Sequence, residues 1–571
     1  MLTLVVLAPL WLVGIFGRAL WTPDEPREAD IAWRMSQQSD RTLPHLGGTP
    51  FLEKPPLTYW LSAATVLVWG DSPDAARAPN ALYALLTALA VGALALAMDL
   101  DLMSALLAAL VASSALTAFR VTSWLAPDAC LLAGNALALL GLWRGFRAPP
   151  GSHKTRGYAL MHLGAALGFM AKSAPGWLVP RLALLVLLAW ERRWAELRRP
   201  ELYAGLLLQA LIIAPWLWAV ARSTGGAEAL RTLFWNNIVG RFTQLAAPQA
   251  LDYTSGHHNS PGKYFLELPL YLLPWTLVAA ASLVRAWRHR GAAEAAGTPW
   301  RFALAASLPF LLLLSLAATA RDIYAAPALL GFALLAALWL QEAQAAPTRL
   351  DQWCVRGTRV LAALAGGLLV AALIVLALAG SAARAWTVVV SVGILAVGIP
   401  ALRRSQRAQA RGALGQSLAW TYAAYAAALS LSALVAFPVI DRWQDLGGLA
   451  RRIRADTAHQ PLALLDPDET TLAIIDHGFS GSYSVLTGTD VSAARRWFAT
   501  RGSNARILVL LPGHAEGELT RWLTHWYRAR SPGDGVAGTL VASGTAALVQ
   551  RYELPQGRRY ALLGPPHPLP P

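Results

Sequence analysis

Charged side chains and cysteine are both scarce in this chain, and each shortage narrows what the protein can be. Only 14% of the 571 residues are charged, whereas 56% are hydrophobic; soluble domains usually carry about 25% charged residues. The two cysteines, Cys130 and Cys354, are too few for a disulfide framework, and both fall in or beside apolar runs. These shortages argue against a disulfide-rich secreted fold and against a large soluble helical protein.

Several familiar signals are also missing. Residues 1–20 are apolar but have no basic residue before the apolar core and no clear small-residue cleavage site, so we expect a retained first span instead of a removed signal peptide. The C-terminal part has no glycine-rich phosphate loop, no metal-ligand spacing and no nucleophile elbow.

What the chain does have is a series of long apolar runs. Runs of about 18 or more apolar residues indicate membrane-spanning helices, and the 24 tryptophans suit a protein with rings at the headgroup level. We therefore predict a multi-pass α-helical membrane protein with about 13 transmembrane helices. The expected spans are residues 1–20, 81–98, 102–120, 126–143, 158–172, 175–191, 203–220, 267–284, 302–319, 325–341, 359–380, 386–402 and 418–438.

The net charge of +15 does not indicate nucleic-acid binding, because the basic residues gather in short loops between apolar runs. Four such loops fall on one side of the predicted topology, which is then the cytoplasm; Arg18, at the end of the first span, falls on the opposite side and does not fit this pattern. The loop at 21–80 and the chain after about residue 440 are expected outside, which in a bacterial inner membrane is the periplasm.

Residues 1–438 are thus predicted to form the transmembrane domain and residues 439–571 a small periplasmic α/β domain. Apolar runs at 461–465, 507–511, 538–543 and 547–554 predict strands, and 492–500 and 516–528 predict helices. Without a chemical motif, this domain is interpreted as a lid or interaction domain.

Ionisable residues at membrane level are costly and by default mark function. The first outer loop opens with Asp24, Glu25, Arg27, Glu28 and Asp30, and Lys54 precedes two prolines that hold its backbone extended. Further charged or polar positions are expected on the same side: Asp128, Lys172, His257, His258, Arg321 and Tyr324. A carboxylate beside several cations suits acid–base chemistry next to bound phosphates.

These motifs resemble a known family. The elements Asp24-Glu25-x-Arg27 and Phe51-x-Glu53-Lys54-Pro55-Pro56, at this spacing after a first span, resemble those of the lipid-A aminoarabinose transferases. The similarity extends to the wider group of membrane glycosyltransferases with the GT-C fold, which includes protein mannosyltransferases. Weaker matching elements are Pro44-His45, Pro127-Asp128, Lys172 with Gly176 and Pro180, the 257–264 loop and Arg321-x-x-Tyr324-x-x-Pro327.

The resemblance implies inverting transfer of a sugar from a polyprenyl-phosphate donor to a periplasmic lipid or glycan acceptor such as lipid A. Asp24 would be the catalytic carboxylate, and Glu25 would shape the site. Lys54, Lys172 and Arg321 would hold phosphates and Tyr324 would hydrogen-bond one; Asp128 would be a second acidic site residue. Arg27, His257 and His258 are also candidate substrate-binding residues.

Three positions depart from the family pattern: Glu28 replaces an aromatic, Ser173 a glycine, and Gly262-Lys263 part of an aromatic run. They leave the sugar and the acceptor open. No cofactor is certain. A divalent metal is compatible with the sequence but is not indicated, because His257 and His258 are adjacent and lack a ligand array.

Two other functions are compatible with the sequence. A transporter or flippase of lipid-linked sugars predicts internal repeats and polar residues at midplane, and neither is seen. A non-catalytic envelope assembly protein would make the C-terminal domain its working part.

Overall fold

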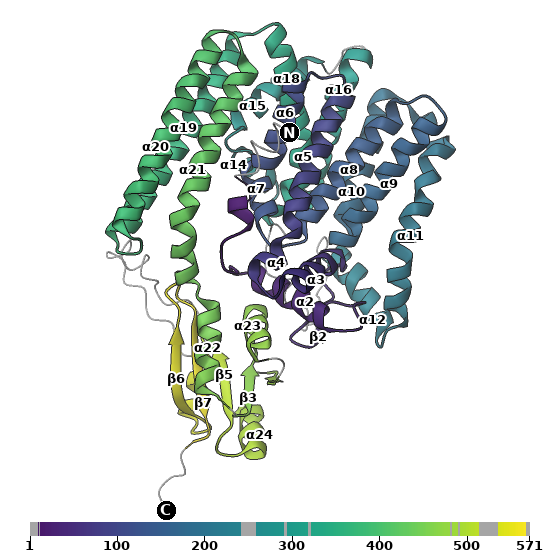
Figure 1. The fold of residues 1–571 in the computed structure, drawn as a ribbon. Helices are drawn as coiled ribbons and strands as arrows, with labels where there is room; N and C mark the ends of the chain where they lie inside the picture. Colours follow the sequence, from purple (N-terminus) through teal and green to yellow (C-terminus); the bar gives the residue numbers. More distant parts are fainter. Residues whose placement is uncertain are drawn as a thin grey trace, which may run out of the picture.

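A computed structural model describes residues 10, 12–240, 259–289, 294–317, 321–458, 460–479, 482–488, 491–512 and 535–566. A bundle of long helices occupies one part of the molecule, and a small sheet with its helices extends from one end of the bundle (Figure 1). The short helices of the first loop lie at that same end, between the bundle and the sheet (Figure 1).

Nine helical segments of the described chain are long and apolar enough to cross a membrane, or ten with one bent pair. The protein is therefore a multi-pass membrane protein, as predicted. The bent pair is α6 and α7, which meet at 62°. Half of the first predicted span, residues 1–9 and 11, lies outside the described residues. The expected total of about 13 spans stays a prediction. The predicted span at 267–284 is interrupted, because α14 ends at Tyr271 and α15 begins at Thr276.

The helices of the bundle follow the predicted order. They are α5 (Pro79–Ala97), α6 (Leu102–Ser114), α7 (Leu116–Ser123), α8 (Asp128–Arg147), α9 (Ser152–Lys172), α10 (Ala174–Glu191), η1 (Trp194–Arg198), α11 (Pro200–Arg222), α12 (Gly226–Leu230), η2 (Arg231–Gly240), α14 (Lys263–Tyr271), α15 (Thr276–Arg288), α16 (Glu294–Ala305), α17 (Leu308–Leu316), η5 (Asp322–Ala325), α18 (Ala326–Ala345), α19 (Arg349–Leu378), α20 (Arg384–Ala410) and α21 (Leu414–Trp443).

The helices differ in what surrounds them. α18 is apolar and almost wholly buried, so it forms the centre of the bundle. α19 and α20 are just as apolar but expose large side chains such as Leu364, Leu368 and Val392. In a bilayer such faces contact lipid tails, which is why these helices need no polar face.

α8 and α9 approach each other closely enough that side chains would collide. A Cβ atom on Gly141 would lie 2.2 Å from the backbone nitrogen of Met161, and one on Gly164 would lie 2.4 Å from that of Ala138. Small residues at a helix interface permit such backbone contact. The contact fixes the start of α8 beside the end of α9, where Asp128 and Lys172 stand.

The first loop folds into α2 (Glu25–Gln37), the short strands β1 (His45–Leu46) and β2 (Thr49–Pro50), α3 (Leu57–Trp69) and α4 (Pro73–Arg77). Glu25 and Glu28 lie in the first turn of α2, where the helix dipole favours negative charge, and Pro26 suits a helix start. The loop is therefore structured, and Asp24 is held directly before a helix.

The C-terminal part contains α22 (Leu446–Asp456), β3 (Leu462–Leu465), α23 (Glu469–Phe479), β4 (Ser484–Leu486), α24 (Val491–Arg501), β5 (Arg506–Leu510), α26 (Gly535–Ala542), β6 (Ala547–Glu553) and β7 (Arg559–Gly564). The strand order is β4-β3-β5-β7-β6, with β4, β3 and β5 parallel and β7 antiparallel to both β5 and β6. The structure thus has a mixed α/β sheet here.

One predicted strand is wrong: of residues 538–543, the first five belong to helix α26 (Gly535–Ala542), and Ser543 lies in the turn that follows it. An apolar run this short does not separate a helix from a buried strand by periodicity. The buried side chains Ala537 and Leu540 lie three residues apart, which is helical spacing, and they pack under Trp497 and Phe498. The predicted helix at 516–528 lies outside the described residues.

Candidate functional site

Asp24 is the centre of a buried ion cluster. Its carboxylate accepts hydrogen bonds from Arg321 at 3.3 and 2.6 Å, one to each oxygen, and from Arg27 at 3.2 Å. Only 6% of Asp24 is exposed. Burial alone would raise the pKa of Asp24, but Arg27, Arg321 and Lys54 outweigh it and lower the pKa to about 2. Asp24 is therefore an anion at any physiological pH.

Arg321 reaches Asp24 from the other half of the chain, 297 residues away. It stands before η5 and α18, and its backbone oxygen accepts a hydrogen bond from the Tyr264 hydroxyl at 3.2 Å. The carboxylate of Asp24 raises the pKa of Arg321 beyond the lowering effect of burial. Both residues of the Asp24–Arg321 pair thus have a further contact: Asp24 with Arg27, and Arg321 with Tyr264.

Glu28 connects the cluster to Lys54. One oxygen of Glu28 accepts from Arg27 at 2.8 Å and from Lys54 at 2.9 Å, and Glu53 lies 3.5 Å from the Lys54 ammonium. Burial would lower the pKa of Lys54, but Glu28 and Glu53 together raise it. Lys54 is therefore a fixed cation. The family departure at Glu28 supplies a carboxylate that holds two cations of the cluster.

Glu25 faces another set of partners. Its oxygens accept from Arg18 at 2.5 and 2.7 Å and from the backbone N–H groups of Trp21 and Leu125 at 2.8 and 2.9 Å. Glu25 is fully buried and 3.5 Å from Arg77. These contacts connect the start of α2 to neighbouring segments. Glu25 therefore helps to fix the position of Asp24, which directly precedes it in the chain. The partner of Glu25 is therefore Arg18, the residue that did not fit the predicted one-sided distribution of basic residues.

Asp128 and Lys172 form an ion pair at the start of α8 and the end of α9. The Lys172 ammonium also lies 4.5 Å from the centre of the Tyr324 ring, a cation–π contact. Three of the predicted site residues thus meet.

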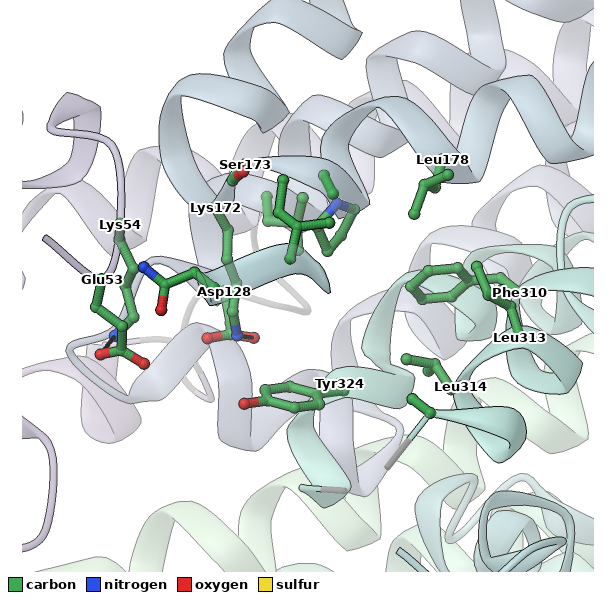
Figure 2. Close-up of a pocket in the computed structure, with 16 residues that line it drawn as sticks. Glu53, Lys54, Asp128, Lys172, Ser173, Leu178, Phe310, Leu313, Leu314 and Tyr324 are labelled. Atoms are coloured by element: carbon green, nitrogen blue, oxygen red, sulfur yellow. Dashed lines mark hydrogen bonds and ion pairs between the residues drawn. The ribbon is translucent and has the colours of Figure 1, made fainter. Parts of the chain in front are cut away.

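A pocket of about 110 Å³ opens beside this second group. Figure 2 shows charged and polar side chains on one side of it and apolar side chains on the other. Its charged and polar lining residues are Glu53, Lys54, Asp128, Lys172, Ser173, Asn237 and Tyr324, and its apolar lining residues are Leu131, Ala174, Pro175, Leu178, Ile238, Phe310, Leu313, Leu314 and Ala317. We call this space the amphipathic pocket. It suits a ligand with an anionic head and a hydrocarbon tail.

Two predicted residues cannot be placed, because His257 and His258 lie outside the described residues. Within the described part of the chain, no group of three or more His, Cys, Asp or Glu side chains is arranged to hold a metal ion. The positively charged groups of the site, among the described residues, are side chains of lysine and arginine.

Sequence reasoning missed Glu469. Its carboxylate, from the first turn of α23, forms an ion pair with Arg27. Glu469 is 442 residues from Arg27, and no local motif marks it, so no signal in one sequence could have linked them.

The sequence and the fold were compared with known proteins. Residues 53–218 match the model of the dolichyl-phosphate-mannose-protein mannosyltransferase family. Curated relatives named undecaprenyl phosphate-alpha-4-amino-4-deoxy-L-arabinose arabinosyl transferase include those of Serratia proteamaculans, 28% identical over 50% of both chains, and Edwardsiella ictaluri, 30% identical over 60% of this chain and 59% of the relative. The chain spans about half the length of most curated relatives it matches.

Solved structures extend the similarity of fold to nearly the whole chain. ArnT from Cupriavidus metallidurans bound to undecaprenyl phosphate has a TM-score of 0.71 at 17% identity, covering 98% of this chain and 97% of that one. The oligosaccharyltransferase of Archaeoglobus fulgidus, in complex with zinc and sulfate, has a TM-score of 0.50 at 12% identity, covering 98% and 72%. The predicted GT-C type membrane fold and the resemblance to the aminoarabinose transferases are confirmed.

Proposed function

We propose that this chain is a glycosyltransferase that moves a sugar from a polyprenyl-phosphate carrier to a cell-envelope lipid or glycan such as lipid A. The proposal rests on one observation: the buried cluster that contains the Asp24–Arg321 pair also contains Lys54, and Lys54 lines the amphipathic pocket. The relatives named above act in transfer, which favours transfer over transport.

The amphipathic pocket supplies a place for the donor phosphate. Lys54 and Lys172 are among its charged lining residues, and each is paired with a carboxylate that orients it. The pocket, with a cavity volume of about 110 Å³, opens beside these two ammonium groups, so an anionic head can bind there. The polyprenyl chain then leaves over Phe310 and Leu314 toward the lipid.

Asp24 acts on the acceptor in this proposal. While Arg321 holds both of its oxygens, a carboxylate with a pKa of about 2 is a weak base. A donor phosphate competes for Arg321, and loss of that contact raises the pKa of Asp24, because burial then counts for more. The donor thus prepares the carboxylate that the acceptor needs.

The transfer itself inverts the anomeric centre. The acceptor oxygen forms a bond to the anomeric carbon from the face opposite the phosphate, and the bond from that carbon to the phosphate oxygen breaks with its electron pair. Polyprenyl phosphate leaves as the anion beside Lys54 and Lys172. A hydroxyl acceptor gives its proton to Asp24, whereas a phosphate acceptor has none to give.

The membrane side of the site is also part of the proposal. Figure 1 shows α2 and α3 at the end of the bundle that carries the C-terminal sheet. Asp24 and Lys54 precede these two helices, Arg321 is paired with Asp24, and Lys172 lines the same pocket as Lys54. Basic residues lie in the last turns of α8, α15 and α20, and Arg192 follows α10, at the helix ends opposite to this end of the bundle. Because basic loops stay cytoplasmic, the site and residues 439–571 face the periplasm.

The direct test replaces Asp24 by asparagine, which keeps the shape and removes the charge. We expect Asp24→Asn to lower kcat for transfer from a radiolabelled polyprenyl-phosphate sugar by at least about 100-fold, with folding intact. Asp99→Asn is the matched control, since Asp99 is exposed and has a positive φ of 62° that asparagine tolerates.

Full transfer by Asp24→Asn would contradict the assignment of Asp24 as the catalytic carboxylate. If neither the wild type nor Asp99→Asn transfers sugar while both move the intact lipid-linked sugar across vesicles, the protein is a transporter. Mass spectrometry of envelope lipids and glycans from cells with and without the protein identifies the acceptor.

A further inference from the structure

Helices α2 and α23 lie side by side, parallel and in register. Arg27 pairs with Glu469 and Arg34 pairs with Asp476, and both pairs join residues that are 442 apart. Equal offsets at both pairs mean that the helices run in the same direction. The two arginines are seven residues apart, about two helical turns, so they share one face of α2.

The middle of this helix pair is apolar. Ile31 and Met35 of α2 and Ala473 of α23 are buried in one cluster. Leu46, Phe51, Tyr59 and Ala63 of the first loop are the other buried members of the cluster. A C-terminal element is therefore docked on the loop that carries Asp24 by packing as well as by charge.

The two ion pairs make different further contacts. Asp476 accepts a further hydrogen bond from Tyr483 at 2.8 Å, so the Arg34 pair stays within the docked surfaces. Arg27 leads into the site, because its Nη2 donates to Asp24 at 3.2 Å and to Glu28 at 2.8 Å while its Nη1 donates to Glu469.

A guanidinium group is planar and rigid, so a partner that fixes its Nη1 also fixes the direction in which its Nη2 donates. Glu469 therefore restricts the rotation of the group that contacts Asp24. Arg27 itself is only 6% exposed, which leaves little water to replace Glu469 as a partner.

We propose that Glu469 of the C-terminal part is a positioning residue of the active site, which orients Asp24 by holding Arg27. The proposal rests on the function proposed above. It assigns to the C-terminal part a role in the chemical step, beyond covering the site. Arg27 does not line the amphipathic pocket, whereas Lys54 and Lys172 do. Loss of Glu469 therefore lowers kcat and leaves KM for the donor lipid nearly unchanged.

The test compares the two ion pairs in the full-length protein in detergent. Glu469→Gln is expected to lower kcat about tenfold or more, with KM for the donor within about twofold of the wild type. Glu469→Asp keeps the charge and recovers part of the loss. Asp476→Asn, the matched control, weakens docking without touching Arg27; it lowers Tm but keeps kcat, measured well below Tm, within about twofold.

Parallel losses of kcat and Tm in Glu469→Gln and Asp476→Asn would overturn the proposal, because docking alone would explain them. An unchanged kcat in Glu469→Gln would overturn it as well.

Hydrogen exchange separates this proposal from the proposed function. Glu469→Gln is expected to speed exchange in the first turn of α2 by at least about threefold, and Asp476→Asn mainly near Arg34. Equal exchange in the first turn of Glu469→Gln and the wild type would overturn the positioning role. This readout needs no turnover, so it decides the positioning role even if the wild type transfers no sugar.

Discussion

Ser173 follows Lys172 with a φ of 60° and a ψ of −132°, backbone angles that favour glycine. Such a conformation costs a residue with a Cβ about 1–3 kcal/mol. The resemblance to the aminoarabinose transferases implies a glycine at this position, and these backbone angles give a physical reason for it. Ser173 lines the amphipathic pocket, and its buried hydroxyl has no hydrogen-bond partner.

We predict that Ser173→Gly raises the free energy of unfolding by about 1 kcal/mol, the relief of strain less the greater chain entropy of glycine. Thermal unfolding in detergent measures the change. Ser173→Ala removes the hydroxyl but keeps the Cβ, so it should give no comparable gain. Equal stabilisation by both variants would mean that the buried hydroxyl, and not the backbone, is the source of the cost.

Single residues were predictable from sequence where charge stood next to an apolar run. Asp24, Lys54, Lys172 and Arg321 were singled out this way, because an ion at a membrane edge is costly and by default marks function. Their roles in the site stay predictions. What each ion touches was not predictable. Glu25 adjoins Asp24 in sequence yet faces Arg18, since consecutive residues of a helix point about 100° apart.

At the scale of elements, the close contact between α8 and α9 decides where Asp128 meets Lys172. We predict that Gly141→Ala destabilises the protein by about 1–3 kcal/mol, because the added methyl would overlap the backbone of Met161. The shift also separates Asp128 from Lys172, so donor binding weakens. Thermal unfolding and a donor-binding assay measure the two effects.

Gly367→Ala in α19 is the control for this prediction. A Cβ at Gly367 meets nothing within 4 Å, and alanine has the higher helix propensity by about 1 kcal/mol. It should therefore leave stability unchanged or slightly raised. If Gly141→Ala behaved in the same way, the close contact between α8 and α9 would not be needed for stability.

Long elements were easier to predict than short ones. Apolar runs of about 18 or more residues have few alternatives to a membrane helix, and α5, α8, α11, α18 and α21 appear where such runs occur. Residues 538–543 were taken for a strand because six residues do not show a period. The break between α14 and α15 was missed because both sides of it are apolar.

At the scale of the whole molecule, two buried carboxyl groups meet where α23 docks on α2. Asp30 is 1% exposed and Asp476 is fully buried, with Arg34 near both and Tyr483 bonded to Asp476. Burial, followed by the charge of Asp476, raises the pKa of Asp30 well above its usual range.

A raised pKa in the folded state makes stability fall as pH rises from the unfolded value of about 3.9 to the folded value, by up to about 1.4 kcal/mol per pH unit. We predict that Asp30→Asn removes this loss, so Tm at neutral pH rises and its dependence on pH flattens. Thermal unfolding between pH 4 and 8 measures both. A wild-type Tm that does not fall over this range would contradict the raised pKa.

The pairing of α2 with α23 also bears on how the protein is made. Ribosomes synthesise Arg27 442 residues before Glu469, so the membrane helices can be inserted while the first loop still lacks its last contact. A chain cut short by premature termination would then reside in the membrane without the contact that we propose to orient Asp24. If that contact is needed for transfer, the order of translation couples the onset of activity to completion of the polypeptide.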